Sequence, residues 1–140
     1  MMFLLFIASA FAQVTCELIN KKLIVKTVGA NDKLTFSGCQ SGLTVREDEL
    51  EEIEIAKGIV ELAQNSFQNS NNLKTIILGE SLEKIGAQSF ENINSQTNFV
   101  VTIPKNVKTI ENNVFKNAHG VGQLNIVGNN ELVRSEGAHV

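Results

Sequence analysis

Apolar residues recur in the same columns of three successive segments of the chain. The segments begin at Ile53, Ile76 and Val101. Each ends in Phe-X-Asn, with the phenylalanines at Phe67, Phe90 and Phe115. The phenylalanine spacing is 23 (90 − 67) and then 25 (115 − 90), and the two additional residues lie within 93–98. A period of this length is typical of a solenoid, in which each repeat forms one turn.

No repeat can bury its apolar columns alone, so stacking must place equivalent side chains of neighbouring turns in contact. The structural positions of the repeat are Ile55, Leu62, Phe67, Leu78, Ile85, Phe90, Ile103, Ile110 and Phe115. A weaker fourth unit follows, because Leu124-Asn-Ile126 lies 23 residues after Val101-Thr-Ile103 (124 − 101), and Val133 falls in the Ile110 column. Terminal repeats commonly decay because one of their faces meets water.

Within each unit, alternation such as Ile53-Glu-Ile55 predicts a short strand. A turn and a second short extended piece, such as residues 59–62, follow. The spacing of Ile59 and Leu62 also suits a helix, but Gly86 and the abundant Asn and Ser argue against a long one. We therefore expect one helical or 3-10 turn ending at each phenylalanine.

The three units resemble the BspA-like leucine-rich repeat family. Ile103-Pro104, Ile85-Gly86 and the three phenylalanines match the family pattern, whereas the family's Cys column is Ser70, Ile93 and Ala118 here. The resemblance implies a β-rich solenoid, a leucine-rich repeat stack of three clear repeats plus a degenerate fourth. It also implies a surface-exposed or secreted protein of the kind associated with adhesion to host matrix proteins or other cells.

The first 12 residues, MMFLLFIASAFA, have the apolar run and small residues of a signal peptide cut before Gln13. A buried N-terminal strand is the alternative. The polar C-terminus predicts no membrane anchor there, so the mature chain is expected to be secreted or extracellular. We divide the rest into an N-terminal cap (13–50), repeats (51–128) and a degenerate C-terminal repeat or tail (129–140). Within the cap, residues 23–28 and 34–36 predict a hairpin, and residues 13–50 show no repeat.

The chain has two cysteines, Cys16 and Cys39, which are 23 residues apart (39 − 16). In an oxidising compartment two cysteines tend to pair, so a disulfide is expected to pin the cap. Two free buried thiols are the alternative.

Composition narrows the function classes. Twelve basic and fifteen acidic residues give a net charge of −3, which argues against binding to nucleic acid or anionic membranes. Two His and two Cys without ligand spacing predict no metal site and no cofactor. The acidic run 46–54 suggests either a calcium or basic-partner site, or a solvated strand edge that resists aggregation, and the calcium-loop spacing is absent.

No Ser-His-Asp or Cys-His arrangement is visible, and His119 and His139 lie in a loop and a tail. Glu52 and Glu54 form a carboxylate pair, but an exposed strand offers no desolvated pocket to raise one pKa. A secreted hydrolase is therefore a weak alternative, and we predict no catalytic residues.

We predict a recognition module whose ligand-binding residues lie on the strand face opposite the core: Glu52, Glu54, Thr75, Ile77, Val100, Thr102, Gln123 and Asn125. An apolar centre (Ile77, Val100) with polar flanks is how a protein interface looks. Alternatively, these residues are simply good strand formers. The expected partner is a protein, such as a host or matrix protein. End-to-end self-association through the decayed last unit, without a separate ligand, is the alternative.

Polar columns support the same alignment. Glu61 should stack on Lys84, and Glu83 on Lys108, in opposite-charge pairs. A third column, Asn69, Asn92 and Asn117, suggests either a ladder of side-chain amides that bond the neighbouring backbone or three unrelated turn residues.

Overall fold

The computed structural model describes residues 13–28, 34–39, 43, 45–94, 96–127 and 133–134. The predicted signal peptide (1–12) lies outside these residues, as does most of the predicted tail (129–140). The strands are β1 (Gln13–Ile19), β2 (Lys22–Val28), β3 (Leu34–Phe36), β4 (Glu52–Ile55), β5 (Ile59–Leu62), β6 (Thr75–Leu78), β7 (Lys84–Ile85), β8 (Phe99–Ile103), β9 (Thr109–Ile110), β10 (Val121–Ile126) and β11 (Val133–Arg134). A 3-10 turn spans Glu47–Glu49.

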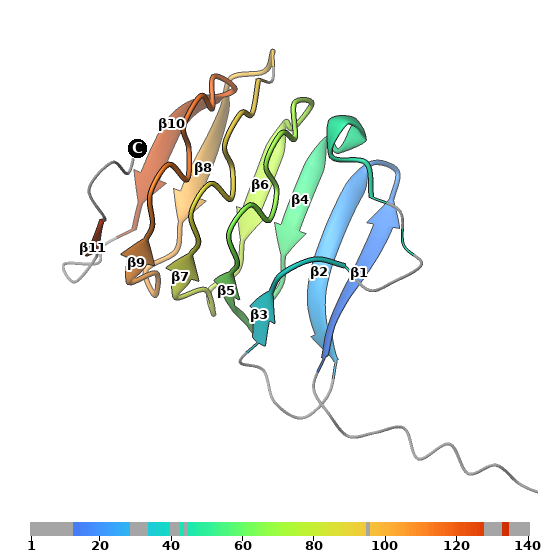
Figure 1. The fold of residues 1–140 in the computed structure, drawn as a ribbon, viewed down its shortest axis with the longest axis vertical. Helices are drawn as coiled ribbons and strands as arrows, with labels where there is room; N and C mark the ends of the chain where they lie inside the picture. The colour runs from blue at the N-terminus through green and yellow to red at the C-terminus, as the bar shows by residue number, and fades with distance from the viewer. Residues whose placement is uncertain are drawn as a thin grey trace, which may run out of the picture.

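The strands form two stacks on either side of a shared core, as Figure 1 shows. The first stack contains β1, β2, β4 and β6 in one sheet, followed by the pair β8 and β10. The second stack is one sheet in the order β3, β5, β7, β9, β11. All pairings in the described chain are parallel except β1 with β2. The chain thus winds as a β-solenoid, which confirms the fold predicted from the repeat.

The register of the strands reproduces the apolar columns. Ile53 pairs with Ile76 and Ile55 with Leu78 in the first stack. In the second stack Leu62, Ile85 and Ile110 are consecutive partners. All three are fully buried, because each side chain is covered by its equivalents in the turns on either side.

The turns that carry the phenylalanines are not helical, contrary to the helical or 3-10 turn predicted before each ring. Two residues of each turn have positive φ, one two positions before the ring and one two positions after it: Asn65, Asn69, Gln88, Asn92, Asn113 and Asn117. A left-handed residue every fourth position cannot belong to a right-handed helix. Asn tolerates this conformation better than most residues, which explains the richness of this stretch in Asn.

A ladder of side-chain amides forms on this side of the solenoid, but its members bond to one another and not to the neighbouring backbone as predicted. Asn117 donates its side-chain amide to Asn92, and Asn92 donates to Asn69, each over 3.0 Å. The acceptor is the neighbouring side-chain oxygen. The charged columns form as well: Lys84 contacts Glu61 at 3.2 Å, and Lys108 contacts Glu83 at 3.5 Å. Each such exposed pair contributes only a few tenths of a kcal/mol.

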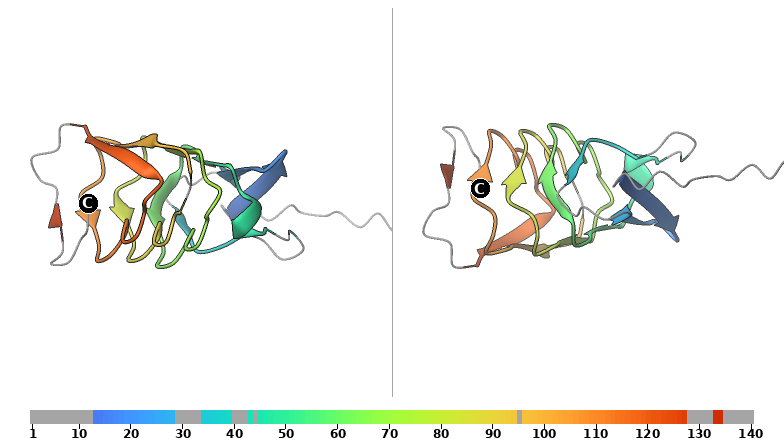
Figure 2. Two further views of the ribbon diagram at one scale, coloured as in Figure 1. Left: turned by 90° about the horizontal axis from the view of Figure 1, so that it is seen from above. Right: turned by 90° about the horizontal axis from the view of Figure 1, so that it is seen from below.

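The predicted hairpin is wrong in its residues. Strand β2 pairs antiparallel with β1, and β3 lies in the second stack beside β5. The hairpin turn is Asn20-Lys21, whose φ values of 47° and 66° are those of a two-residue hairpin turn that matches strand twist. Figure 2 shows this hairpin twisted away from the direction of the other strands.

The cap also contains a turn of the solenoid, although residues 13–50 show no repeat in the sequence. Leu23 and Val25 of β2 pair with Ile53 and Ile55 of β4. In the second stack Phe36 pairs with Leu62. The stack is therefore one turn longer at its N-terminal end than the sequence predicted.

The fourth unit is present with one correction to its register. Leu124 and Ile126 of β10 pair with Val101 and Ile103, as the alignment predicts. In the second stack, however, Arg134 pairs with Ile110, and Val133 pairs with Thr109. The alignment was thus off by one residue after Ile126.

Candidate functional site

The outward side of the first stack carries all eight residues predicted to bind a ligand, and we call it the outer face. Glu52 pairs with Thr75 and Glu54 with Ile77 across β4 and β6. Across β8 and β10, Val100 pairs with Gln123 and Thr102 with Asn125. These positions alternate with buried ones, because successive side chains of a strand point to opposite sides. The structure therefore brings the predicted residues together on one surface.

A seam divides the outer face between β6 and β8. These two strands are neighbours, but no ladder of hydrogen bonds joins them. The seam falls where the sequence inserts two residues, just before β8. A groove of about 210 Å³ lies over it, lined by Ile76, Ile77, Leu78, Glu80, Val100, Thr102, Pro104 and Val127.

The rim of this groove is apolar and exposed. Ile77, Val100 and Val127 are 43%, 49% and 47% exposed, although all three are large aliphatic residues. Ile77 and Val100 were predicted as the apolar centre of the face. Val127 was missed, because it follows the last strand and belongs to no aligned column. The alternation of Asn125, Ile126 and Val127 gave only a weak signal for it.

The acidic end of the outer face is partly neutralised by a residue that the sequence analysis missed. Lys22 of β2 contacts Glu52 and Glu54, each over 2.7 Å. Hydrogen bonds that the Lys22 ammonium donates, first to Glu52 and then to Glu54, raise the pKa of Lys22. Lys22 lies next to β4 only because β2 is the first turn of the stack. The two carboxylates therefore act as a salt-bridged surface cluster.

At the opposite end the outer face carries amides. Gln123 donates its side-chain amide to Asn125 over 2.7 Å, and both are exposed. The face therefore runs from a salt-bridged end, across the apolar groove, to a neutral polar end.

Another charge network lies where the chain enters the strands of the first stack. Lys21 and Lys74 both contact the carboxylate of Glu51, at 2.8 Å and 2.6 Å. Hydrogen bonds from Lys21 and then Lys74 lower the pKa of Glu51 from 4.5 to about 2.

This network predicts a pH dependence that Glu51→Gln should remove. Because the folded pKa is depressed, the stabilisation is complete above pH 4.5 and is lost as pH falls through about 2. We expect the unfolding midpoints of the wild type and Glu51→Gln to converge between these values. An NMR titration of the Glu51 side chain measures its pKa directly. Lys74→Ala should raise that pKa, because one of the two hydrogen bonds to the carboxylate is lost. A pKa of Glu51 near 4.5 in the wild-type protein would contradict the network.

In its described part, the acidic run 46–54 is paired with basic side chains along its length: Glu51, Glu52 and Glu54 contact the lysines named above, and the start of the run pairs within itself. Arg46 contacts Asp48 at 3.0 Å and Glu49 at 2.8 Å around the 3-10 turn. Among the described residues, no three His, Cys, Asp or Glu lie close enough together to hold a metal ion. No helix among the described residues is long and apolar enough to cross a membrane.

The parallel turns, their shared core and the inward aliphatic columns define a scaffold of the leucine-rich repeat type. The BspA type leucine rich repeat region matches residues 44–136, in six copies. The chain therefore belongs to the BspA-type leucine-rich repeat family. Such repeat stacks generally present extended surfaces to other proteins and serve as scaffolds for interaction.

Among solved structures, the chain is similar to a leucine rich repeat protein of T. pallidum (TpLRR), with 14% identity and a TM-score of 0.35, over 80% of this chain and 78% of that one. No curated protein matches the chain.

Proposed function

We propose that this protein is a secreted or cell-surface recognition module that binds a protein ligand, such as a host or matrix protein, through its outer face. The repeat family supports protein interaction as the general role. The leader-like residues 1–12 and the cysteine pair support an extracellular location. Adhesion to other cells or to matrix proteins is the activity that we propose for such a surface in that location.

The observation that carries this proposal is the apolar groove at the seam. Three exposed aliphatic residues from three separate parts of the chain meet there, and polar or salt-bridged residues surround them on the outer face. Covering apolar surface of this kind with a partner lowers the free energy by about 25 cal/mol for each Å² removed from water. A hollow with an apolar rim suits one protruding apolar side chain of the ligand, as at the centre of protein interfaces.

Val100→Asp tests the groove. We expect it to weaken binding to immobilised matrix proteins or host cells by about tenfold or more, because it buries a charge at the interface centre. Val100 is a better position than Ile77, because Ile77 pairs with Glu54 and Asp there would place like charges opposite each other. Surface plasmon resonance or a cell-binding assay measures the effect.

Val28→Asp is the matched control. Val28 is 50% exposed against 49% for Val100, and each is paired across its sheet with a glutamine. The two substitutions should therefore change the unfolding midpoint alike, while only Val100→Asp lowers binding. Equal binding by both variants, at the wild-type level, would exclude the groove as the binding site.

Self-association is the second candidate, and the C-terminal end of the stack favours it. Leu124 and Ile126 are half-buried, whereas their partners Val101 and Ile103 are fully buried. A second chain could cover this end and extend the sheet beside β10. Sedimentation at increasing concentration should then show dimers that Leu124→Lys abolishes. A strict monomer removes this candidate and leaves the first unaffected.

A further inference from the structure

The groove on the outer face contains a single charged side chain, that of Glu80. The other residues that line it are aliphatic or proline, apart from Thr102. Glu80, Pro104 and Val127 follow β6, β8 and β10, so they mark the end of the groove where these strands end. The groove is therefore an apolar hollow with a carboxylate at one end.

Glu80 differs from the other carboxylates of the described chain in having no ion pair. Every other carboxylate whose side chain the structure describes contacts a Lys or an Arg. The carboxylate of Glu80 has neither an ion pair nor a hydrogen bond with any described residue. The negative charge in the groove is thus not neutralised by the part of the chain that the structure describes.

Two lysines stand in positions from which they could have neutralised Glu80. Lys57 and Lys105 hold the equivalent place in the turns before and after it, yet neither forms an ion pair with it. The following turn is joined to Glu80 by Asn106 instead, whose side-chain amide donates to the carbonyl oxygen of Glu80 over 2.6 Å. This bond holds the main chain of Glu80 and leaves its carboxylate available to a donor from another molecule.

An apolar hollow that ends in a carboxylate favours a ligand segment with two properties. An apolar side chain is stabilised when it leaves water to contact Ile77, Val100 and Val127. A cation beside it can donate a charge-assisted hydrogen bond to Glu80. An acidic neighbour would instead meet a like charge. Arginine suits this place well, because its planar group has five donors and it is enriched among the residues that dominate protein interfaces.

We propose that the protein ligand presents to the groove an apolar side chain next to a Lys or Arg, and that this cation binds the carboxylate of Glu80. The inference rests on the proposed function, since it names the chemistry of the partner at the same groove. It assigns Glu80 a role in selecting the ligand, whereas the apolar rim provides the contact area.

The test is an NMR titration of the whole chain with two capped dipeptides, N-acetyl-leucyl-arginine amide and N-acetyl-leucyl-citrulline amide. Citrulline has nearly the shape of arginine but carries no charge. We expect both peptides to shift the methyl groups of Ile77, Val100 and Val127. The arginine peptide should bind about threefold more tightly, as expected for one exposed ion pair.

Glu80→Gln should abolish this preference, because it keeps the size of the side chain and removes its charge. Glu83→Gln is the matched control, since it makes the same change in the same turn. Glu83 contacts Lys108 and does not line the groove, so its variant should keep the preference for arginine.

A preference for the arginine peptide that Glu80→Gln abolishes and Glu83→Gln retains supports the proposal. Equal affinities of the two peptides for the wild type, a preference that survives Glu80→Gln, or no saturable shift up to the solubility of the peptides overturns it. Binding of matrix proteins by Val100→Asp reports separately on the groove. If that substitution weakens binding while the two peptides bind equally, the proposed function stands and only the basic residue of the ligand is rejected.

Discussion

Phe90→Ala is expected to lower the free energy of unfolding by about 3–5 kcal/mol, as for other fully buried aromatic residues. The Phe90 side chain is completely buried. Its ring lies between Phe67, at a centroid distance of 5.6 Å, and Phe115, at 5.5 Å, and the ring planes are nearly parallel. The substitution therefore removes buried area and two stacked contacts at the centre of a four-ring column that begins at Phe36. Because each turn depends on its neighbours, the loss should reach both halves of the stack.

Urea unfolding followed by circular dichroism measures this change, since the chain has no Trp or Tyr to report by fluorescence. Phe115→Ala is the matched control, because Phe115 is slightly exposed and stacks on only one ring in the described chain. It should cost less than Phe90→Ala. Phe90→Leu keeps most of the apolar volume, so it should lower the free energy of unfolding by less than Phe90→Ala does. Equal losses for Phe90→Ala and Phe115→Ala would show that the rings do not act as a continuous column.

The sequence reveals only those turns of the solenoid whose equivalent residues recur at a constant spacing. Turns two to four keep separations of 23 to 25 residues, so their columns align directly. In the first turn, Leu23 pairs with Ile53 at a separation of 30 (53 − 23), and Phe36 pairs with Leu62 at 26 (62 − 36). No single period connects these residues to the repeat. The first turn forms because its strands offer the right apolar faces, and the chain between them absorbs the extra length.

The outer face was predictable in its members and unpredictable in its shape. Alternation along short strands placed Ile77 and Val100 outward, and the repeat brought them to neighbouring strands. The groove depends on the missing ladder between β6 and β8, which follows from backbone positions in space. Lys22 was missed because it belongs to the first turn, whose irregular spacing hides its alignment with Glu52 and Glu54. The prediction of an acidic flank thus overstated the charge that a ligand would meet.

The hairpin prediction failed through turn chemistry. The sequence predicted a hairpin between residues 23–28 and 34–36, whereas the actual turn is Asn20-Lys21, between β1 and β2. Neither residue is glycine, so the pair lacks the strongest hairpin signal. Both nevertheless adopt left-handed φ, which Asn tolerates and Lys accepts here because seven cross-strand pairs fix the register.

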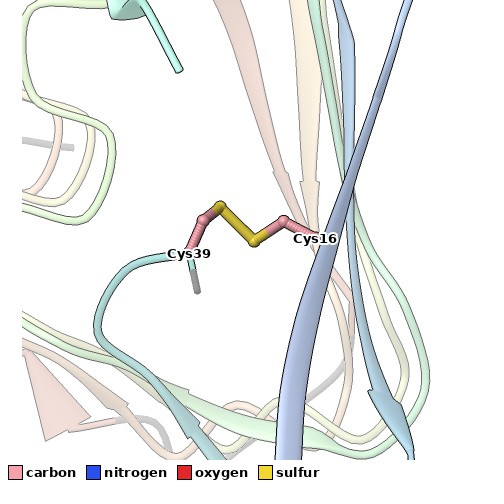
Figure 3. Close-up of a disulfide and its surroundings, with 2 residues drawn as sticks. All are labelled: Cys16 and Cys39. Carbon is pink, nitrogen blue, oxygen red and sulfur yellow. A yellow bond between two sulfur atoms is a disulfide. The ribbon is translucent and has the colours of Figure 1, made fainter. Parts of the chain in front are cut away.

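Removal of the disulfide is expected to lower the free energy of unfolding by about 3 kcal/mol, the loop-entropy value for a closed loop of this length. Cys16 on β1 and Cys39 after β3 are 23 residues apart in sequence, with their Cα atoms 5.5 Å apart. Figure 3 shows the bond crossing the interior from Cys16 on β1 to Cys39 in the segment after β3. It therefore ties the only antiparallel strand of the described chain to the opposite side of the first turn.

Cys16→Ala, Cys39→Ala and the double variant separate this role from simple packing. Each single variant already breaks the bond, so the double variant should be little less stable than either one, far from the sum of the two losses. Hydrogen exchange should accelerate mainly in β1 to β3 and much less in β7 and β9, because the bond restrains the first turn alone. Additive losses, or acceleration spread evenly over the stack, would mean that the two sulfur atoms contribute as buried apolar groups and that the covalent link adds little. Reduction of the wild-type protein should reproduce the double variant, which makes the test independent of the alanine substitutions.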